Sequence, residues 1–120
     1  MVNGDLASVA SQKFIHLTTV GRKTGKPRTV ELWFAICGNR VYLSHEGKEA
    51  HWMKNINKSS NVAFEIGGKS FAGKARLLEE QTEESWMAKI ALYEKYYGKA
   101  SKEVIGDWFS LSKVLAVEPT

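Results

Sequence analysis

Hydrophobic and polar residues alternate with a period of two over several short segments, the pattern of strands that bury one face. Breaks at Gly38-Asn39 and Gly67-Gly68 separate some of these segments and are typical of tight hairpin turns. The predicted strands are Phe14–Val20, Arg28–Cys37, Arg40–His45, Asn61–Ile66, Ser70–Glu79 and Trp108–Val117.

The alternation is clearest in Arg28–Cys37. Its apolar face consists of Val30, Leu32, Phe34 and Ile36. Trp33 falls on the opposite face, so it is an exposed aromatic, an interface residue or a wall of a ligand pocket.

Helical periodicity replaces the alternation in the second half of the chain. Thr82 is a suitable N-cap, Glu83 and Glu84 favour a first helical turn, and Gly98 is placed to end the helix. An amphipathic stripe within this helix is predicted to pack into the core, and it consists of Trp86, Ile90, Tyr93 and Tyr97. Shorter helical segments are predicted over Leu6–Ala10, Glu49–Asn57 and Ser101–Ile105.

Together these elements predict a β-rich α+β fold, with six antiparallel strands, one long helix and one or two short helices. Tight turns between antiparallel neighbours favour a small barrel with helices at its ends. The chain shows no repeat, linker or low-complexity segment, so residues 1–120 are expected to form one domain.

Composition excludes several classes of protein. Cys37 is the only cysteine, which rules out an intrachain disulfide and a cysteine metal cluster. No apolar run approaches the ~20 residues of a membrane-spanning helix, and the N-terminus does not resemble a signal peptide. We therefore expect a cytoplasmic protein with no transmembrane segment. His16, His45 and His51 lack metal-ligand spacing and no nucleophile–base set is evident, so we assign neither a metal site nor a catalytic residue.

The segment between the first two predicted strands, Gly21–Arg28, concentrates positive charge in a protein whose formal net charge is +4. Its cations are Arg22, Lys23, Lys26 and Arg28. Glycines allow successive turn amides to surround an anion, and the cations with the Thr24 hydroxyl suit a phosphate. The alternative is a solvated basic hairpin tip.

Aromatic and polar residues elsewhere extend this hypothesis. Trp33 or Trp52 could stack on a flat ring, and Ser44 and His45 would lie near the basic loop if the first three strands are neighbours. A phosphate site beside an aromatic wall suits a flavin-like cofactor, and it equally suits single-stranded nucleic acid.

The segment Thr18–Leu32, with Gly-Arg-Lys-Thr-Gly-Lys-Pro-Arg at its centre, resembles the signature of the deazaflavin-dependent nitroreductase and quinone reductase family. That family is a branch of the flavin-binding split β-barrels related to pyridoxamine phosphate oxidases. Val41–Gly47, Trp52–Asn55 and Asn61–Ile66 are also similar to segments of the family.

The resemblance implies a six-stranded antiparallel split β-barrel and a homodimer with a deazaflavin coenzyme or FMN at the interface. The cofactor-binding residues that it implies are Arg22, Lys23, Thr24, Arg28, Ser44, His45 and Trp52. Lys23 and Arg28 would hold the phosphate or acidic tail of the cofactor. Glu31 replaces a proline that is common in relatives, and Glu46-Gly47 replaces their glycine pair, so both cofactors stay open.

Three functional hypotheses follow. In the first, a reduced deazaflavin or FMN delivers hydride to a small-molecule electron acceptor such as a quinone or nitro compound, and the cofactor carries the chemistry. In the second, the protein is a flavin-binding or carrier module without efficient turnover. In the third, the basic loop binds nucleic acid, a partner that the first two hypotheses do not require.

Overall fold

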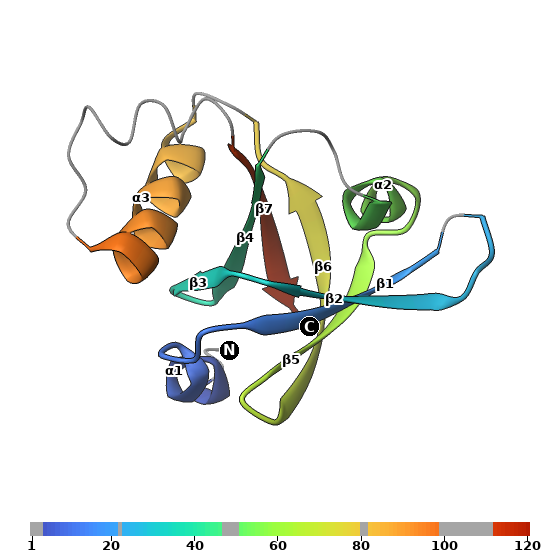
Figure 1. Cartoon of the computed structure of the whole chain (residues 1–120), viewed down its shortest axis with the longest axis horizontal. Helices are drawn as coiled ribbons and strands as arrows, with labels where there is room; N and C mark the ends of the chain where they lie inside the picture. The colour runs from blue at the N-terminus through green and yellow to red at the C-terminus, as the bar shows by residue number, and fades with distance from the viewer. Residues whose placement is uncertain (1–3, 22, 47–50, 80–81, 99–111) are drawn as a thin grey trace.

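The computed structural model describes residues 4–21, 23–46, 51–79, 82–98 and 112–120. Its helices and strands follow one another along the chain as shown in Figure 1. They are α1 (Gly4–Val9), β1 (Ile15–Val20), β2 (Pro27–Leu32), β3 (Phe34–Cys37), β4 (Arg40–Glu46), α2 (His51–Lys58), β5 (Asn61–Ile66), β6 (Lys69–Leu77), α3 (Glu83–Tyr97) and β7 (Ser112–Pro119).

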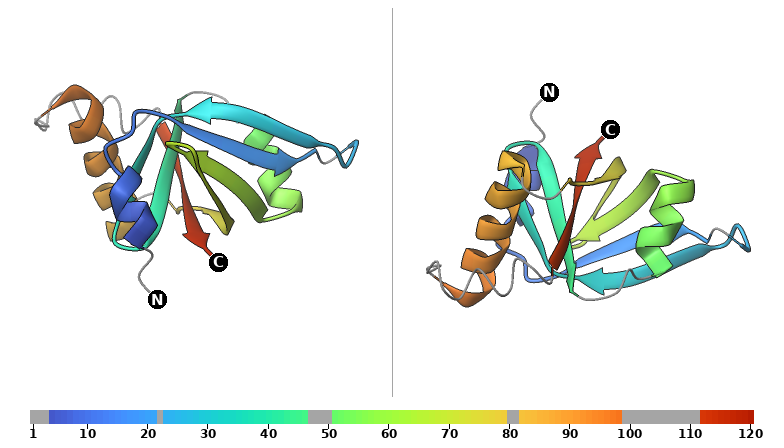
Figure 2. Two further views of the ribbon diagram at one scale, coloured as in Figure 1. Left: turned by 90° about the horizontal axis from the view of Figure 1, so that it is seen from below. Right: turned by 90° about the horizontal axis from the view of Figure 1, so that it is seen from above.

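The strands form one antiparallel sheet in the order β2-β1-β5-β6-β7-β4-β3. Its two outermost strands, β2 and β3, are consecutive in the chain and are separated only by Trp33. The sheet must therefore curl until its two edges meet, and Figures 1 and 2 show this curled arrangement. The predicted β-rich fold with an antiparallel sheet is thus confirmed, and the curled sheet is consistent with a split barrel.

The prediction of a single strand over Arg28–Cys37 is wrong. β2 pairs with β1, whereas β3 pairs with β4, so the chain changes partner at Trp33. The Trp33 ring stacks on Tyr96 of α3, with ring centroids 4.2 Å apart and planes inclined by 5°. Because of this break, the described residues contain seven strands and not six.

The remaining strands follow the predicted pattern closely. β5 has the predicted bounds, and Gly67 and Gly68 make the predicted turn with φ of 57° and 83°, values that favour glycine. β6 begins one residue earlier and ends two residues earlier than expected. The predicted strand start at Trp108 and the helical turn over Ser101–Ile105 lie outside the described residues.

The main core fills the inside of the curled sheet. Strand residues such as Leu17, Leu43 and Ile66 are fully buried there. Leu6 and Val9 of α1 and Met53 and Ile56 of α2 belong to the same cluster. The two short helices therefore cover openings of the barrel, and each adds buried apolar surface to the core.

The long helix α3 lies outside the barrel, against β3, β4 and β7 (Figure 2). Thr82 caps it as predicted, because its Oγ1 accepts a hydrogen bond from the Ser85 amide at 3.2 Å. Gly98 ends it as predicted.

The predicted core stripe of α3 is wrong. Trp86, Ile90 and Tyr97 are 50%, 37% and 54% exposed, and Tyr93 is only half-buried. The buried side of the helix consists of Ser85, Ala88, Lys89 and Leu92. These residues face small side chains of the sheet, including Ala35 and Ala116, and small side chains allow a helix to approach a sheet closely.

None of the helices among the described residues combines the length and apolar character needed to cross a membrane.

Candidate functional site

The basic loop joins β1 and β2 and lies at the end of the molecule opposite α3 in every view (Figures 1 and 2). Sheet pairing places Arg28 opposite Thr19 and Pro27 opposite Val20. Beyond this pair, the Gly21 amide donates to the Lys26 carbonyl at 2.8 Å. Arg28 is thus fixed by the sheet, whereas Lys26 belongs to the turn.

Gly21 and Thr24 set the conformation of this loop. A Cβ on Gly21 would lie 2.9 Å from Thr24 Oγ1 and 3.1 Å from the Lys26 carbonyl oxygen, so any larger residue would force the loop to shift. The Thr24 hydroxyl accepts a hydrogen bond from the Lys26 amide at 3.3 Å, and the Gly25 amide donates to the Gly21 carbonyl. Because three loop amides are engaged within the loop, an anion would be bound mainly by side chains.

The described cations of the loop, Lys23, Lys26 and Arg28, are exposed and form no ion pair with any described residue. By contrast, Arg40 lies 2.9 Å from a Glu118 carboxylate oxygen and Arg76 lies 2.8 Å from one of Glu84. The hairpin tip therefore keeps an uncompensated positive charge that can attract an anionic ligand. Arg22 lies outside the described residues.

Helix α2 is attached to the end of β1 beside this loop. The Asn55 side-chain amide donates a hydrogen bond to Thr19 Oγ1 at 3.1 Å, and both residues are buried. Residues directly opposite each other on paired strands point to the same face of a sheet. Arg28, the partner of Thr19, therefore projects on the face of the hairpin that α2 covers.

The other predicted site residues come from two separate elements. Trp52 belongs to the first turn of α2, and Ser44 and His45 lie near the end of β4. Ser44 is half-buried and pairs with Val114 of β7. The side chains of His45 and Trp52 lie outside the described part of the structure. The structure thus places α2 against the end of β1 that leads into the basic loop, whereas no hydrogen bond among the described residues joins Ser44 to that loop.

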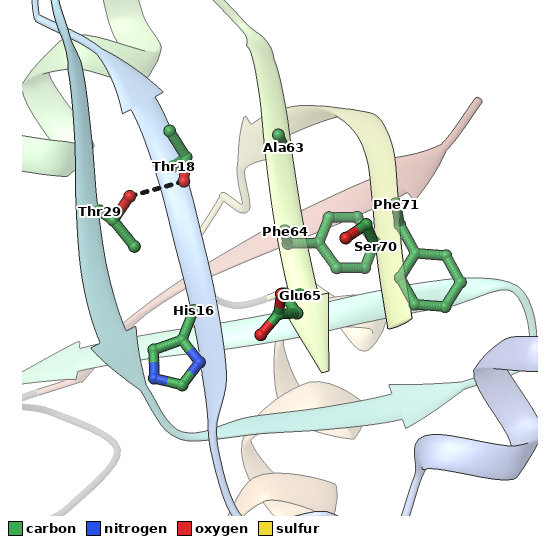
Figure 3. Close-up of a pocket in the computed structure, with 8 residues that line it drawn as sticks. All are labelled: His16, Thr18, Thr29, Ala63, Phe64, Glu65, Ser70 and Phe71. Atoms are coloured by element: carbon green, nitrogen blue, oxygen red, sulfur yellow. Dashed lines mark hydrogen bonds between the residues drawn. The ribbon is translucent and has the colours of Figure 1, made fainter. Parts of the chain in front are cut away.

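A hollow of about 480 Å³ lies on the opposite face of the same hairpin (Figure 3). Its polar lining consists of His16, Thr18, Thr29, Glu65 and Ser70, and Phe71 adds an aromatic wall. The Thr18 and Thr29 hydroxyls are 2.7 Å apart. Because Thr29 and Arg28 are adjacent in β2, they point to opposite faces, so this hollow and the Arg28 side chain do not form one site.

Sequence reasoning did not find this hollow. The available signal was that alternate residues of β1 and β5 point outward, which places His16 and Glu65 side by side. The His16 Nε2 atom lies 3.1 Å from a carboxylate oxygen of Glu31, on the other flanking strand. This contact gives the Glu31 carboxylate a partner on the outward face of the sheet.

Cys37 offers no nucleophile to the site. It is a half-buried residue at the end of β3, and burial raises the pKa of its thiol. A raised pKa leaves less thiolate, the reactive form.

A family model described as F420H(2)-dependent quinone reductase matches residues 3–105. The conserved hypothetical protein Rv2991 of Mycobacterium tuberculosis has a similar structure, with a TM-score of 0.80 at 20% identity, over 99% of this chain and 81% of that one.

Two further solved structures share the fold. An F420-H2-dependent reductase (FDR-A) has a TM-score of 0.65 at 23% identity, over 88% of this chain and 93% of its own. A protein of Listeria innocua, provisionally assigned as a pyridoxamine 5′-phosphate oxidase, has a TM-score of 0.70 at 18% identity, over 97% and 90% of the two chains.

Proposed function

Since the chain belongs to the F420H(2)-dependent quinone reductase family, and is therefore an oxidoreductase, we propose that it reduces a small acceptor such as a quinone or nitro compound. The cofactor of this reaction is a deazaflavin coenzyme or FMN, which when bound in reduced form supplies the hydride. The residues of the chain bind the cofactor and keep water away from it.

The observation that carries this proposal is the uncompensated charge of the described cations of the basic loop. Lys23 and Arg28 are exposed, unpaired among the described residues, and mounted on a hydrogen-bonded hairpin tip. Both cofactors carry a phosphate, so the residues present suit this part of either molecule. Arg28 would bind the phosphate through two parallel hydrogen bonds, and Lys23 would add a point charge.

Other residues would contribute to the same site. Arg22 and Thr24 would maintain the loop, and Trp52 on α2 would form an aromatic wall for the ring system. Ser44 and His45 would approach the cofactor from the end of β4. The position of α2 beside the hairpin supports the contribution of Trp52.

We also propose that the protein is a homodimer with the cofactor at the interface. Trp33 gives no separate support, because its ring stacks on Tyr96 of its own chain. Sedimentation equilibrium tests this proposal. A dimer at micromolar concentration is expected, and a monomer that binds cofactor with full affinity would contradict it.

Calorimetric titration of the purified protein with FMN and with the deazaflavin coenzyme tests cofactor binding directly. Saturable binding of at least one of them, at one site per chain, is expected. A protein that binds neither cofactor, and instead retains RNA through purification, would favour the nucleic-acid hypothesis.

A further inference from the structure

The contact between Thr19 and Asn55 is unusual among the buried contacts of the molecule because both side chains are polar. Thr19 is 1% exposed and Asn55 is 3% exposed, and the Asn55 amide lies 3.1 Å from the Thr19 hydroxyl. Their neighbours on α2, Met53 and Ile56, are apolar core residues. An apolar pair of the same size would fill this volume equally well, without the cost of removing polar groups from water.

A buried hydrogen bond adds direction, which apolar packing lacks. Apolar side chains tolerate small rotations and shifts of a helix, whereas a hydrogen bond weakens steeply when its geometry changes. The bond between Asn55 and Thr19 therefore fixes the rotation of α2 about its axis and its height along β1.

Each residue of this hydrogen bond lies close to a proposed cofactor residue, Thr19 through sheet pairing and Asn55 on the same helix. Thr19 pairs with Arg28 and lies two residues before Gly21, where the basic loop begins. Asn55 lies three residues after Trp52 on α2, about one helical turn away.

We infer that Asn55 and Thr19 are positioning residues of the cofactor site, which hold α2 and the basic loop at the separation that the cofactor requires. This inference rests on the proposed function. Neither residue needs to touch the cofactor, because both act through Arg28 and through the backbone of α2.

Thr19→Val tests the inference, since it removes the hydroxyl and keeps the shape of the side chain. Thr18→Val is a matched control. It makes the same change one residue earlier in β1, where the Thr18 hydroxyl contacts Thr29 on the outward face, away from α2. Leu92→Ala is a second control, because it destabilises the fold within the α3 cluster.

The readout is the dissociation constant for FMN and for the deazaflavin coenzyme, measured calorimetrically at a temperature where every variant is folded. Thr19→Val is expected to weaken binding about tenfold or more, the size of effect that the loss of an orienting hydrogen bond has at metal sites. Thr18→Val and Leu92→Ala should bind like the wild type. Thr19→Ser keeps the hydroxyl and should bind the cofactor like the wild type. This comparison tests the inference even if Thr19→Val folds poorly.

The possible outcomes separate the two proposals. If the wild type binds cofactor and Thr19→Val weakens binding no more than Leu92→Ala does, the bond is merely structural and the inference is wrong. The same conclusion follows if Thr19→Ser is as weak as Thr19→Val. If the wild type binds neither cofactor, the proposed function is wrong, and this inference, which rests on it, is wrong as well.

Discussion

Arg28 and Lys26 carry the same charge and are two residues apart, but they differ in how firmly their backbones are held. Arg28 is held by sheet pairing with Thr19, whereas Lys26 lies in the turn. Arg28→Lys should therefore weaken cofactor binding although it keeps the charge, because lysine lacks the guanidinium fork. Arg28→Ala should cost about 1.5–3 kcal/mol of binding free energy, and Lys26→Ala should be nearly neutral. Calorimetric titration of the three variants measures these differences.

The nucleic-acid hypothesis makes a different prediction for the same variants. Each cation would then count about equally, and each removal would reduce the salt dependence of binding by about one unit. Equal and small losses of cofactor affinity when Lys23, Lys26 and Arg28 are each changed to alanine would mean that the loop is only a charged surface.

The side-chain amine of Lys95, on α3, is the basis of a second prediction at the scale of single residues. Its Nζ is buried without a hydrogen-bond partner among the described residues and lies 3.4 Å from the centre of the Phe34 ring. Burial lowers the pKa of Lys95 from 10.5 to about 8. Below pH 8 the amine is charged in both the folded and the unfolded state, and the folded state bears the cost of burying that charge.

Between pH 8 and 10.5 the folded protein loses this proton while the unfolded chain keeps it, so stability from this group rises with pH. Lys95→Met should therefore raise the melting temperature at pH 7, and its advantage should shrink as the pH rises to 10.5. Lys74→Met, an exposed change on β6, is the control and should have little effect at either pH. A Lys95→Met protein that melts below the wild type at pH 7 would show that the contact with Phe34 outweighs the cost of burial.

Only some of these residue roles could be read from the sequence. The glycines and cations of the basic loop stand together in the chain, so Gly21 and Arg28 were evident as a cluster. The bond between Asn55 and Thr19 joins residues 36 positions apart, and no local pattern marks it. The unpaired amine of Lys95 is equally hidden, because it depends on how α3 meets the sheet.

At the scale of elements, α3 reverses the expectation for Ile90. The side chain of Leu92 is 1% exposed and that of Ile90 is 37% exposed, although both are apolar and lie on one helix. Leu92→Ala should lose about 2–5 kcal/mol of unfolding free energy, and Ile90→Ala should lose clearly less. Denaturant titration of the two variants compares them. Equal losses would show that the outer face of the helix is as well packed as the inner one.

The N-terminal end of α3 is held to the sheet by Glu84. Its carboxylate accepts two hydrogen bonds from Arg76, at 2.9 and 2.8 Å, and one from the Tyr42 hydroxyl at 2.8 Å. The bonds from Arg76 are the main cause that lowers the pKa of Glu84 below its ordinary value of 4.5. A lowered pKa contributes stability above pH 4.5, and that stability is lost as the pH falls through the folded-state pKa.

Glu84→Gln should therefore be less stable than the wild type at pH 7, by about 1 kcal/mol or more, because the charge-assisted bonds are weakened. The difference should narrow as the pH falls below 4.5. Glu83→Gln changes the adjacent, exposed carboxylate and should have a much smaller effect. A constant difference between Glu84→Gln and wild type from pH 7 to pH 3 would show that charge is not the source of the stability.

Period-two alternation located the strands well because most of them bury one face and end at glycine-containing turns. It could not locate the break at Trp33, since apolar residues alternate without interruption from Val30 to Ile36. The change of partner there depends on tertiary pairing. Similarly, the helical period predicted that the stripe containing Trp86 and Ile90 is buried, whereas the small residues of α3 face the sheet.

At the scale of the whole molecule, the curled sheet separates two kinds of surface on one hairpin. Arg28 and α2 lie on one face, and the hollow lined by His16 and Thr18 lies on the other. α3 lies at the far end of the molecule from the basic loop (Figure 2). Changes such as Leu92→Ala should therefore affect stability without altering the proposed site.

The most direct test of the proposed function is an anaerobic reaction of the purified protein with reduced deazaflavin coenzyme and a soluble quinone, followed by the absorbance of the oxidised coenzyme. The proposed function predicts oxidation of the coenzyme that is proportional to protein concentration, saturates with both substrates and is slowed by Arg28→Ala. The same experiment with reduced FMN identifies the preferred cofactor. Tight binding of either cofactor, with oxidation no faster than in the absence of protein for any quinone or nitro acceptor tried, would contradict the proposed reductase activity and indicate a carrier.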